Sequence, residues 1–373
     1  MVRIADIFKN VKDASPSLKK EDSVEPVPVR TEKPAIVSNA DTPKENLRKP
    51  LMPLISEAIK STQVNKSGIA TGVYQEALRL SQTIFEKAKT GDMITGKEVQ
   101  KTVDDITSEL TYDNTELLNL ACNQVLKEEV SETDFLAAKM VNKTVLAIEI
   151  GIGKKWNRSQ LFQLGTAAFF SDLGIVKVLD IVTKKEILTA QDWARLREVP
   201  YKTVEILKKI PDLSHVVLTV AKESHERSDG SGPLGIRDIK ELDGFSRIVA
   251  VIDAFEALTH DRPHRPRKLP HEAMKIILHD GEKFESDVLR LLIDRIGIYP
   301  IGSWVQLTNK EYAKITGSNP GWPLRPKVKV MFDAYGSLMN EPHFIDLAVT
   351  RSIQVLQPVS DKDLKKLMEE NPY

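Results

Sequence analysis

The chain contains very little material for thiol chemistry, because Cys122 is the one cysteine among its 373 residues. A disulfide framework within the chain is therefore excluded. Cys122 lies in the apolar helical pattern L-L-N-L-A-C-N-Q-V-L, and this context favours a small buried side chain over a reactive thiol.

Long apolar runs are also missing. The longest, from Val145 to Gly153, contains Glu149 and is too short to span a bilayer. Residues Met1 to Asn10 lack the apolar segment of a signal peptide. We therefore expect a cytoplasmic protein that does not insert into a membrane.

The sequence has no excess of charge of either sign. Lys and Arg number 53 in total, as do Asp and Glu. A neutral chain has no global field that attracts nucleic acid or an anionic membrane, so such binding would need a local basic patch. The four tryptophans are not interleaved with basic residues, as they would be in a platform that stacks bases. We therefore expect no nucleic-acid partner.

Changes in composition along the chain distinguish an N-terminal tail, a long helical part, a β-rich part and a C-terminal tail. Residues 1–52 mix Pro, Lys, Glu, Ser and Val without periodicity, which predicts a disordered tail. Residues 53–130 and 131–298 repeat apolar side chains at three- and four-residue steps, which predicts helices. Residues 299–358 contain short runs of β-type residues separated by turn signals, and residues 359–373 form a tail that reads as one short helix.

A short apolar stripe lies at the extreme N-terminus and consists of Ile4, Ile7, Phe8 and Val11. This spacing fits a helix that docks on a partner, or a transient helix in a disordered tail. The shortness of the stripe favours the transient helix.

Three collinear motifs carry the strongest functional signal. They are L-G-T-A-A-F-F-S-D-L-G (Leu164 to Gly174), S-H-E-R-S-D-G-S-G (Ser224 to Gly232) and R-I-V-A-V-I-D-A-F-E-A-L-T-H-D-R-P (Arg247 to Pro263). In this order they resemble the HD-GYP family, bacterial phosphodiesterases that hydrolyse cyclic di-GMP at a cluster of metal ions.

The resemblance implies a fold for most of the chain. It predicts a mainly α protein, in which an HD-superfamily helical bundle over residues 131–298 follows a set of N-terminal helices. A small SH3-like β-barrel over residues 299–358 is implied after the bundle, on the pattern Y-P-x-G-x-x-V-x-L that begins at Tyr299.

Most of the side chains that the resemblance implies for metal and phosphate binding are substituted. The substituted positions are Lys139, Ser171, Ile175, Val199 and Ser224. Three ligand positions keep the residue type of the family, namely Asp172, His225 and Asp253. A hydrolytic site needs several imidazoles and carboxylates converging on its cations. We therefore expect no catalytic residue and no cofactor, and a protein that acts in signalling or as a scaffold for other proteins.

Two alternatives stay open. Asp172, His225 and Asp253 could hold a single Fe or Mn ion in a metal-dependent phosphodiesterase or phosphohydrolase with a reduced site. Arg262 and Arg265 match a family segment near the substrate phosphates, so the chain could also bind cyclic di-GMP without hydrolysing it. Ile175, at a position where the family has lysine, argues against this receptor function.

The alignment places an ammonium group where the family has a ligating imidazole. We expect Lys139 to neutralise Asp172 and Asp253, since two buried carboxylates without a cation repel each other. The alternative is that Lys139 points to solvent. His225 by itself is more often a hydrogen-bonded core histidine than a ligand. His260 and three others have no ligand-like partners in the sequence and are expected at the surface: His264, His271 and His279.

The loop from Gly232 to Gly244 differs from the Gly-Tyr-Pro triplet of the family and is rich in aliphatic residues. In the family this loop is implicated in contact with diguanylate cyclase domains. Leu234 and Ile236 are therefore candidate interface residues for such a domain or another signalling protein, unless they pack onto the bundle.

Overall fold

The computed structural model of this protein describes residues 51–123 and 134–371, with side chains from residue 68 onward. Residues 1–50 of the predicted N-terminal tail, including its apolar stripe, lie outside the described residues. Its last two residues, Leu51 and Met52, begin the first described helix. None of the described helices is both long enough and apolar enough to cross a membrane.

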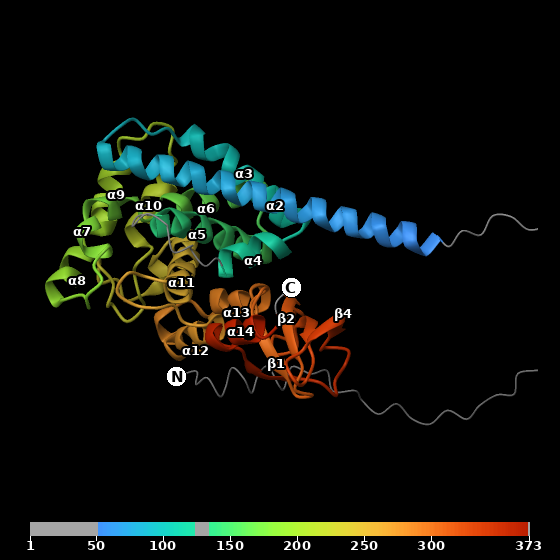
Figure 1. Cartoon of the computed structure of the whole chain (residues 1–373). Coiled ribbons are helices and arrows are strands. Elements are labelled where there is room, and N and C mark those ends of the chain that lie inside the picture. The colour runs from blue at the N-terminus through green and yellow to red at the C-terminus, as the bar shows by residue number, and fades with distance from the viewer. Residues whose placement is uncertain (1–50, 124–133, 372–373) are drawn as a thin grey trace, which may run out of the picture.

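Three helices precede the central bundle. The first, α2 (Leu51–Thr90), ends just before Gly91, whose φ of 85° is typical of a glycine that terminates a helix. It is followed by α3 (Gly96–Tyr112) and α4 (Thr115–Asn123). Figure 1 shows the first half of α2 extending beyond the other helices. The buried face of α3 includes the predicted apolar stripe of Val99, Val103, Ile106 and Leu110.

The centre of the bundle is α5 (Asp134–Gly153), which is buried from Phe135 to Gly151 apart from Lys139. Burial on nearly all sides is typical of a helix that is surrounded by other helices. The elements that follow it are α6 (Arg158–Phe170), η1 (Leu173–Lys177), α7 (Leu179–Val182), α8 (Ala190–Leu196), α9 (Val199–Leu207), α10 (His215–Glu223), η2 (Ile239–Glu241) and α11 (Gly244–Thr259). Of these, α6 and α11 pack directly against α5.

The helical part closes with α12 (Pro270–His279), η3 (Gly281–Lys283) and α13 (Ser286–Arg295). One hydrophobic core extends from α2 to α13 and includes Cys122, Phe169 and Phe170. The prediction of a buried thiol is therefore confirmed, and burial raises the pKa of Cys122 to about 12.

The C-terminal unit is an antiparallel sheet of five strands in the order β4-β3-β2-β1-β5. The strands are β1 (Trp304–Leu307), β2 (Tyr312–Gly317), β3 (Lys327–Phe332), β4 (Leu338–Asp346) and β5 (Val355–Pro358), followed by α14 (Asp361–Glu369). Because β4 and β5 are the two edges and do not pair with each other, the strands do not form a barrel, and the predicted small SH3-like β-barrel is corrected to an open five-stranded sheet. The predicted C-terminal helix is confirmed as α14.

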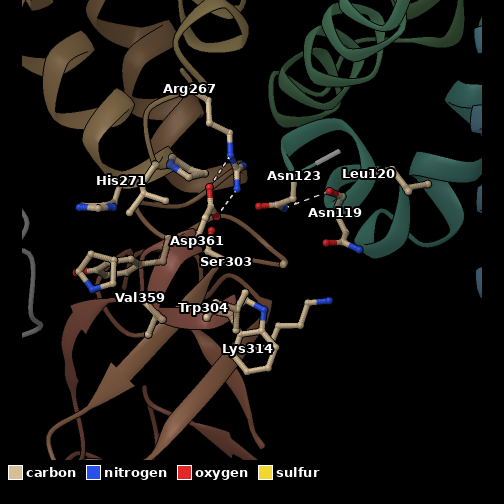
Figure 2. A pocket seen from close by; sticks show the side chains of 16 residues that line it. Asn119, Leu120, Asn123, Arg267, His271, Ser303, Trp304, Lys314, Val359 and Asp361 are labelled. Carbon is tan, nitrogen blue, oxygen red and sulfur yellow. Dashed lines mark hydrogen bonds and ion pairs between the residues drawn. The ribbon is translucent and has the colours of Figure 1, made fainter. Parts of the chain in front are cut away.

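The sheet and the helical part meet through several contacts. Tyr299 packs against both hydrophobic cores. The Arg267 guanidinium binds Asp361 at the start of α14 through two contacts of 3.0 and 2.5 Å. Figure 2 shows this pair at the edge of a cavity of about 330 Å³, with Trp304 and Lys314 of the sheet on one side and Asn119 and Asn123 of α4 on the other.

Candidate functional site

The candidate site lies where α5, the segment after α6, the segment after α10 and α11 converge. Asp172 follows α6 and directly precedes η1. The close packing of η1 on α9 depends on Gly174, because a Cβ atom there would lie 2.3 Å from the backbone nitrogen of Thr203. The Gly174 N–H donates to Thr203 Oγ1 at 2.9 Å. This packing holds the turn that carries Asp172 against the bundle.

Helix geometry brings the other charged groups to the same place. Lys139 and Lys143 are four residues apart on α5 and therefore lie on one face of that helix. Asp253 is a buried residue in the middle of α11, and His225 follows the end of α10. The site thus combines four segments that are distant in the sequence.

The expected ion pairs of Lys139 are present. Its Nζ lies 2.6 Å from Asp172 Oδ2 and 3.0 Å from Asp253 Oδ1. The Lys139 side chain is 12% exposed, so it does not point into open solvent.

A second lysine, which the sequence analysis missed, occupies the same cluster. Lys143 Nζ lies 2.7 Å from Asp172 Oδ2 and 3.2 Å from Asp253 Oδ1. Its side chain is 1% exposed. The spacing of four residues from Lys139 was the available signal, because residues at this spacing project from the same side of a helix.

His225 completes the cluster on the opposite oxygens of the two carboxylates. Its Nε2 lies 2.7 Å from Asp172 Oδ1, and its Nδ1 lies 3.4 Å from Asp253 Oδ2. One ligand atom each from Asp172, His225 and Asp253 lie within 4.8 Å of one another, which is a spacing suited to a metal ion. The structure therefore brings the three retained family positions together.

The charges in this cluster stabilise each other's ionised forms. Burial alone would raise the pKa of Asp172, but the ammonium groups of Lys139 and Lys143 outweigh it and hold that pKa well below its usual range. The pKa of Asp253 is lowered against burial by the same two groups. The two carboxylates in turn raise the pKa values of Lys139 and His225, again against burial.

The other four substituted positions contribute no charged or imidazole group to the cluster. Ser171 is buried and its hydroxyl donates to the Ala168 carbonyl at 2.9 Å. Ser224 is also buried, and its Oγ has no hydrogen-bond partner in the described part of the chain. Val199 belongs to a small apolar cluster, against which the half-buried Ile175 packs.

The prediction that His260 lies at the surface is wrong. His260 is 8% exposed, and its Nε2 lies 3.2 Å from the side-chain nitrogen of Asn142. Tyr74 of α2 donates to the other side of that amide at 2.5 Å. The amide nitrogen therefore donates to Nε2, and the His260 Nδ1–H donates to the Glu256 carbonyl at 3.1 Å. A histidine in this network satisfies buried polar groups, which the sequence pattern does not reveal.

A cavity of about 450 Å³ opens above the cluster. Lys139, Asp172, His225, Arg262 and Arg265 all contribute to its lining. Arg262 is held by Glu256, whose Oε2 lies 2.5 Å from its Nη2. Arg265 lies at the same cavity and donates to the Ala257 carbonyl. Both arginines line the cavity, and phosphate contact at these residues stays a prediction.

The loop with the candidate interface residues folds back onto the buried side chain of Glu226. Its carboxylate accepts from the backbone N–H groups of Leu234 at 2.5 Å and Ile236 at 3.0 Å. Both side chains are half-buried. This placement agrees better with packing onto the bundle than with a fully exposed binding loop.

The comparisons with known proteins agree with this geometry. Residues 115–288 match the model described as HD domain, and residues 304–367 match that described as KOW domain associated with HD domain. The chain contains an HD domain. Its match begins at Thr115, so α4 is part of the HD domain as well as the helices from α5 onward.

Similar proteins are found among cyclic dinucleotide phosphodiesterases. A cyclic di-GMP phosphodiesterase of Pseudomonas aeruginosa is 26% identical over 269 residues, covering 71% of this chain and 63% of that protein. One of Borreliella burgdorferi is 22% identical, covering 62% of this chain and 59% of that protein. A 3'3'-cGAMP-specific phosphodiesterase of Vibrio cholerae is 44% identical over a shorter stretch, covering 21% of this chain and 19% of that protein. The chain is thus homologous to cyclic di-GMP phosphodiesterases and spans about three fifths of the length of the first two.

Among solved structures, an HDG"Y"P protein from Bdellovibrio bacteriovorus is similar to this chain. The two are 16% identical with a TM-score of 0.48, and the match covers 60% of this chain and 70% of that one.

Proposed function

We propose that this protein is a catalytically inactive relative of cyclic di-GMP phosphodiesterases, whose HD domain works in signalling as a scaffold for other proteins. The observation that carries the proposal is the pair of lysines on the carboxylate oxygens. Lys139 and Lys143 both lie within 3.2 Å of Asp172 Oδ2 and Asp253 Oδ1.

The charge balance of the cluster argues against adding metal ions. Two carboxylates face two ammonium groups, so the net charge is zero with a neutral His225 and +1 with a protonated one. A divalent cation at the same oxygens would bring two further positive charges into a buried site whose nearby third carboxylate, Glu256, is already paired with Arg262. The residues present therefore do not fit a cluster of metal ions while both lysines are charged.

Hydrolysis of a phosphodiester at such a site requires a water molecule that loses its proton near neutral pH because it is bound to metal. Ser171, Val199 and Ser224 supply no imidazole to hold a metal ion, and Lys139 and Lys143 supply the positive charge in its place. We therefore expect the ion cluster to stabilise the fold of the HD domain without activating water.

A scaffold protein binds its partners through its surface. The half-buried Leu234 and Ile236 form a less prominent candidate interface than the C-terminal unit. In that unit Phe344 on β4 is 66% exposed and Val349 after it is 78% exposed. Exposed apolar side chains beside a free sheet edge support protein binding there, and a signalling protein such as a diguanylate cyclase domain remains our proposed type of partner.

The arrangement of Asp172, His225 and Asp253 supports one alternative. If one lysine were displaced or neutral, their three ligand atoms could hold a single Fe or Mn ion, and the protein would be a metal-dependent phosphodiesterase or phosphohydrolase. Arg262 and Arg265 at the cavity support another, namely a receptor that binds cyclic di-GMP without hydrolysis.

Metal analysis combined with an activity assay tests the proposal. The native protein, purified without added metal, is analysed for Fe and Mn. It is then assayed for cyclic di-GMP hydrolysis with either metal added. The Pseudomonas aeruginosa relative serves as the positive control. We expect less than about 0.1 metal ion per chain and no hydrolysis above the metal-only blank. Stoichiometric metal together with hydrolysis would support the enzyme alternative, and nucleotide binding without either would support the receptor.

A further inference from the structure

The cavity above the ion cluster has an unusual charge distribution for a chain with no net charge. Six charged side chains line it, five of which are basic: Lys139, Asp172, Arg197, Arg227, Arg262 and Arg265. The single acid, Asp172, is already paired with two lysines. The cavity therefore presents a positive potential that its own carboxylates do not cancel.

Three of these arginines have no carboxylate partner. In the described part of the chain, Arg197, Arg227 and Arg265 form no ion pair, and their polar contacts are with backbone carbonyl groups. Arg197 donates to the backbone carbonyl of Ser231 at 3.2 Å, and Arg227 donates to the backbone carbonyl of Glu226 at 2.8 Å. Each guanidinium has five N–H donors in a planar fork, so several donors remain for an anion.

The rest of the cavity wall is largely apolar. It includes Ile175, Leu188, Trp193 and Val199. Trp193 is 56% exposed. The uncharged polar lining consists of Ser231 and His264, apart from His225, which is engaged with the carboxylates. Apart from its arginines, the wall has few groups that could read the hydrogen-bonding edge of a nucleobase, and it suits a flat apolar body.

We propose that this cavity binds a small amphipathic anion, in which one phosphate or carboxylate group is joined to an apolar or aromatic body. The anionic group is bound by Arg197, Arg227 and Arg265, while the body packs on Trp193 and the aliphatic wall. This inference deepens the proposed function, because it requires a site in which lysines rather than metal ions neutralise Asp172 and Asp253. The volume of about 450 Å³ is within the range of small-molecule sites.

Titration calorimetry of the full-length protein with 1-naphthyl phosphate in the presence of a chelator tests the inference. We expect a dissociation constant below about 1 mM, and binding at least about tenfold tighter than that of inorganic phosphate or uncharged 1-naphthol, since each of these supplies one half of the contacts. The affinity should fall as salt is added. Equal affinity for the three compounds, or no binding of 1-naphthyl phosphate, would overturn the inference.

Substitutions locate the binding. Arg227→Gln should weaken 1-naphthyl phosphate binding by about tenfold or more, and Trp193→Ala by a smaller factor. The matched control is Arg290→Gln, which removes one positive charge from a side chain of α13 that is 76% exposed. Circular dichroism confirms that each variant is folded. Affinities of the two cavity variants that equal that of Arg290→Gln would contradict the assigned site.

The same compound separates this inference from the proposed function. Release of 1-naphthol, followed by its fluorescence, would show phosphatase activity and contradict a catalytically inactive site. Binding that is weakened by Arg227→Gln would still support the anion cavity in that case. Conversely, if 1-naphthyl phosphate is neither hydrolysed nor bound, the proposed function stands and the inferred anion site is rejected.

Discussion

Lys139 and Lys143, one helical turn apart on α5, share one pair of carboxylate oxygens. Both ammonium groups contact Asp172 Oδ2 and Asp253 Oδ1 at distances between 2.6 and 3.2 Å. The arrangement places two fixed positive charges, carried by the protein itself, between two carboxylates that would otherwise repel each other. It makes the cluster dependent on the simultaneous presence of all four groups.

Loss of Lys143 should therefore be costly. In Lys143→Met the buried carboxylates keep a single ammonium group, and removal of one partner from a buried ion cluster typically costs about 3–5 kcal/mol. We expect the free energy of unfolding in urea to fall by this order. Lys101→Met, at a side chain that is 81% exposed, is the matched control and should change stability by less than about 0.5 kcal/mol.

Charge balance, rather than lost packing, should explain the effect of Lys143→Met. The double variant Lys143→Met/Asp253→Asn removes one charge of each sign, so it should recover part of the lost stability. If the double variant is as unstable as the sum of the two single variants, the ion-cluster explanation fails.

Restoring histidines alone should not restore metal binding. A variant with Ser171→His, Val199→His and Ser224→His keeps both lysines, whose charges repel cations. Replacing Lys139 by His in addition should also be insufficient, because Lys143 lies on the same oxygens. We expect Fe or Mn to be retained in purified protein only when Lys143 is replaced as well, for example by Ala. Stoichiometric metal in the first variant, measured by elemental analysis, would show that the lysines are a weak barrier.

The loop after the S-H-E-R motif should depend on Glu226 and Gly232. A Cβ atom at Gly232 would lie 2.6 Å from Glu226 Cα, so Gly232→Ala forces the loop away from the carboxylate that binds its backbone. The loss of these charge-assisted hydrogen bonds is worth about 1.5–3 kcal/mol each. Limited proteolysis should cut the loop faster in Gly232→Ala than in Gly235→Ala, whose added Cβ meets nothing within 4 Å although its φ of 72° also disfavours alanine. Equal cutting rates would contradict this account of the loop.

His260 should make stability dependent on pH. Burial lowers its pKa from 6.5, an effect that Glu256 opposes and Arg262 reinforces. Below pH 6.5 the unfolded chain binds a proton that the folded chain does not, so this contribution to stability is lost as the pH falls, at up to about 1.4 kcal/mol per pH unit. In His260→Gln the loss between pH 6.5 and pH 5 should be smaller, as measured by urea unfolding. The control His279→Gln, at an exposed position, should show the same change of unfolding free energy with pH as the wild type. If His260→Gln also shows the same change as the wild type, the effect is refuted.

The helices before the bundle could be predicted because they depend on local patterns. Apolar residues at helical spacing indicated helices in the region of α2 to α4. The contact of Lys139 with Asp172 and Asp253 was expected from the family resemblance, which places an ammonium group where the family has a ligating imidazole.

The remaining features depend on tertiary packing. Lys143 was missed because its burial follows from the position of α5 at the centre of the bundle rather than from any motif. His260 was misplaced because its burial depends on packing against Asn142 of α5, a contact between distant segments, although Glu256 precedes it by four residues on α11. The open sheet differs from the predicted barrel because closure requires pairing between the edge strands β4 and β5, which alternation along one strand cannot reveal.

The contact between Arg267 and Asp361 connects the C-terminal unit to the segment that lines the cavity above the ion cluster. Arg265 lines the cavity and Arg267 binds the start of α14, so a single residue separates the two arginines along the chain. The Arg267 backbone N–H donates to Asp261 Oδ1 at 2.9 Å, which closes the turn from residue 261 to residue 267 that contains Arg265. A chain segment this short cannot absorb a large displacement internally. We therefore expect that a displacement of α14 which keeps this ion pair intact would also shift Arg265 at the rim of the cavity.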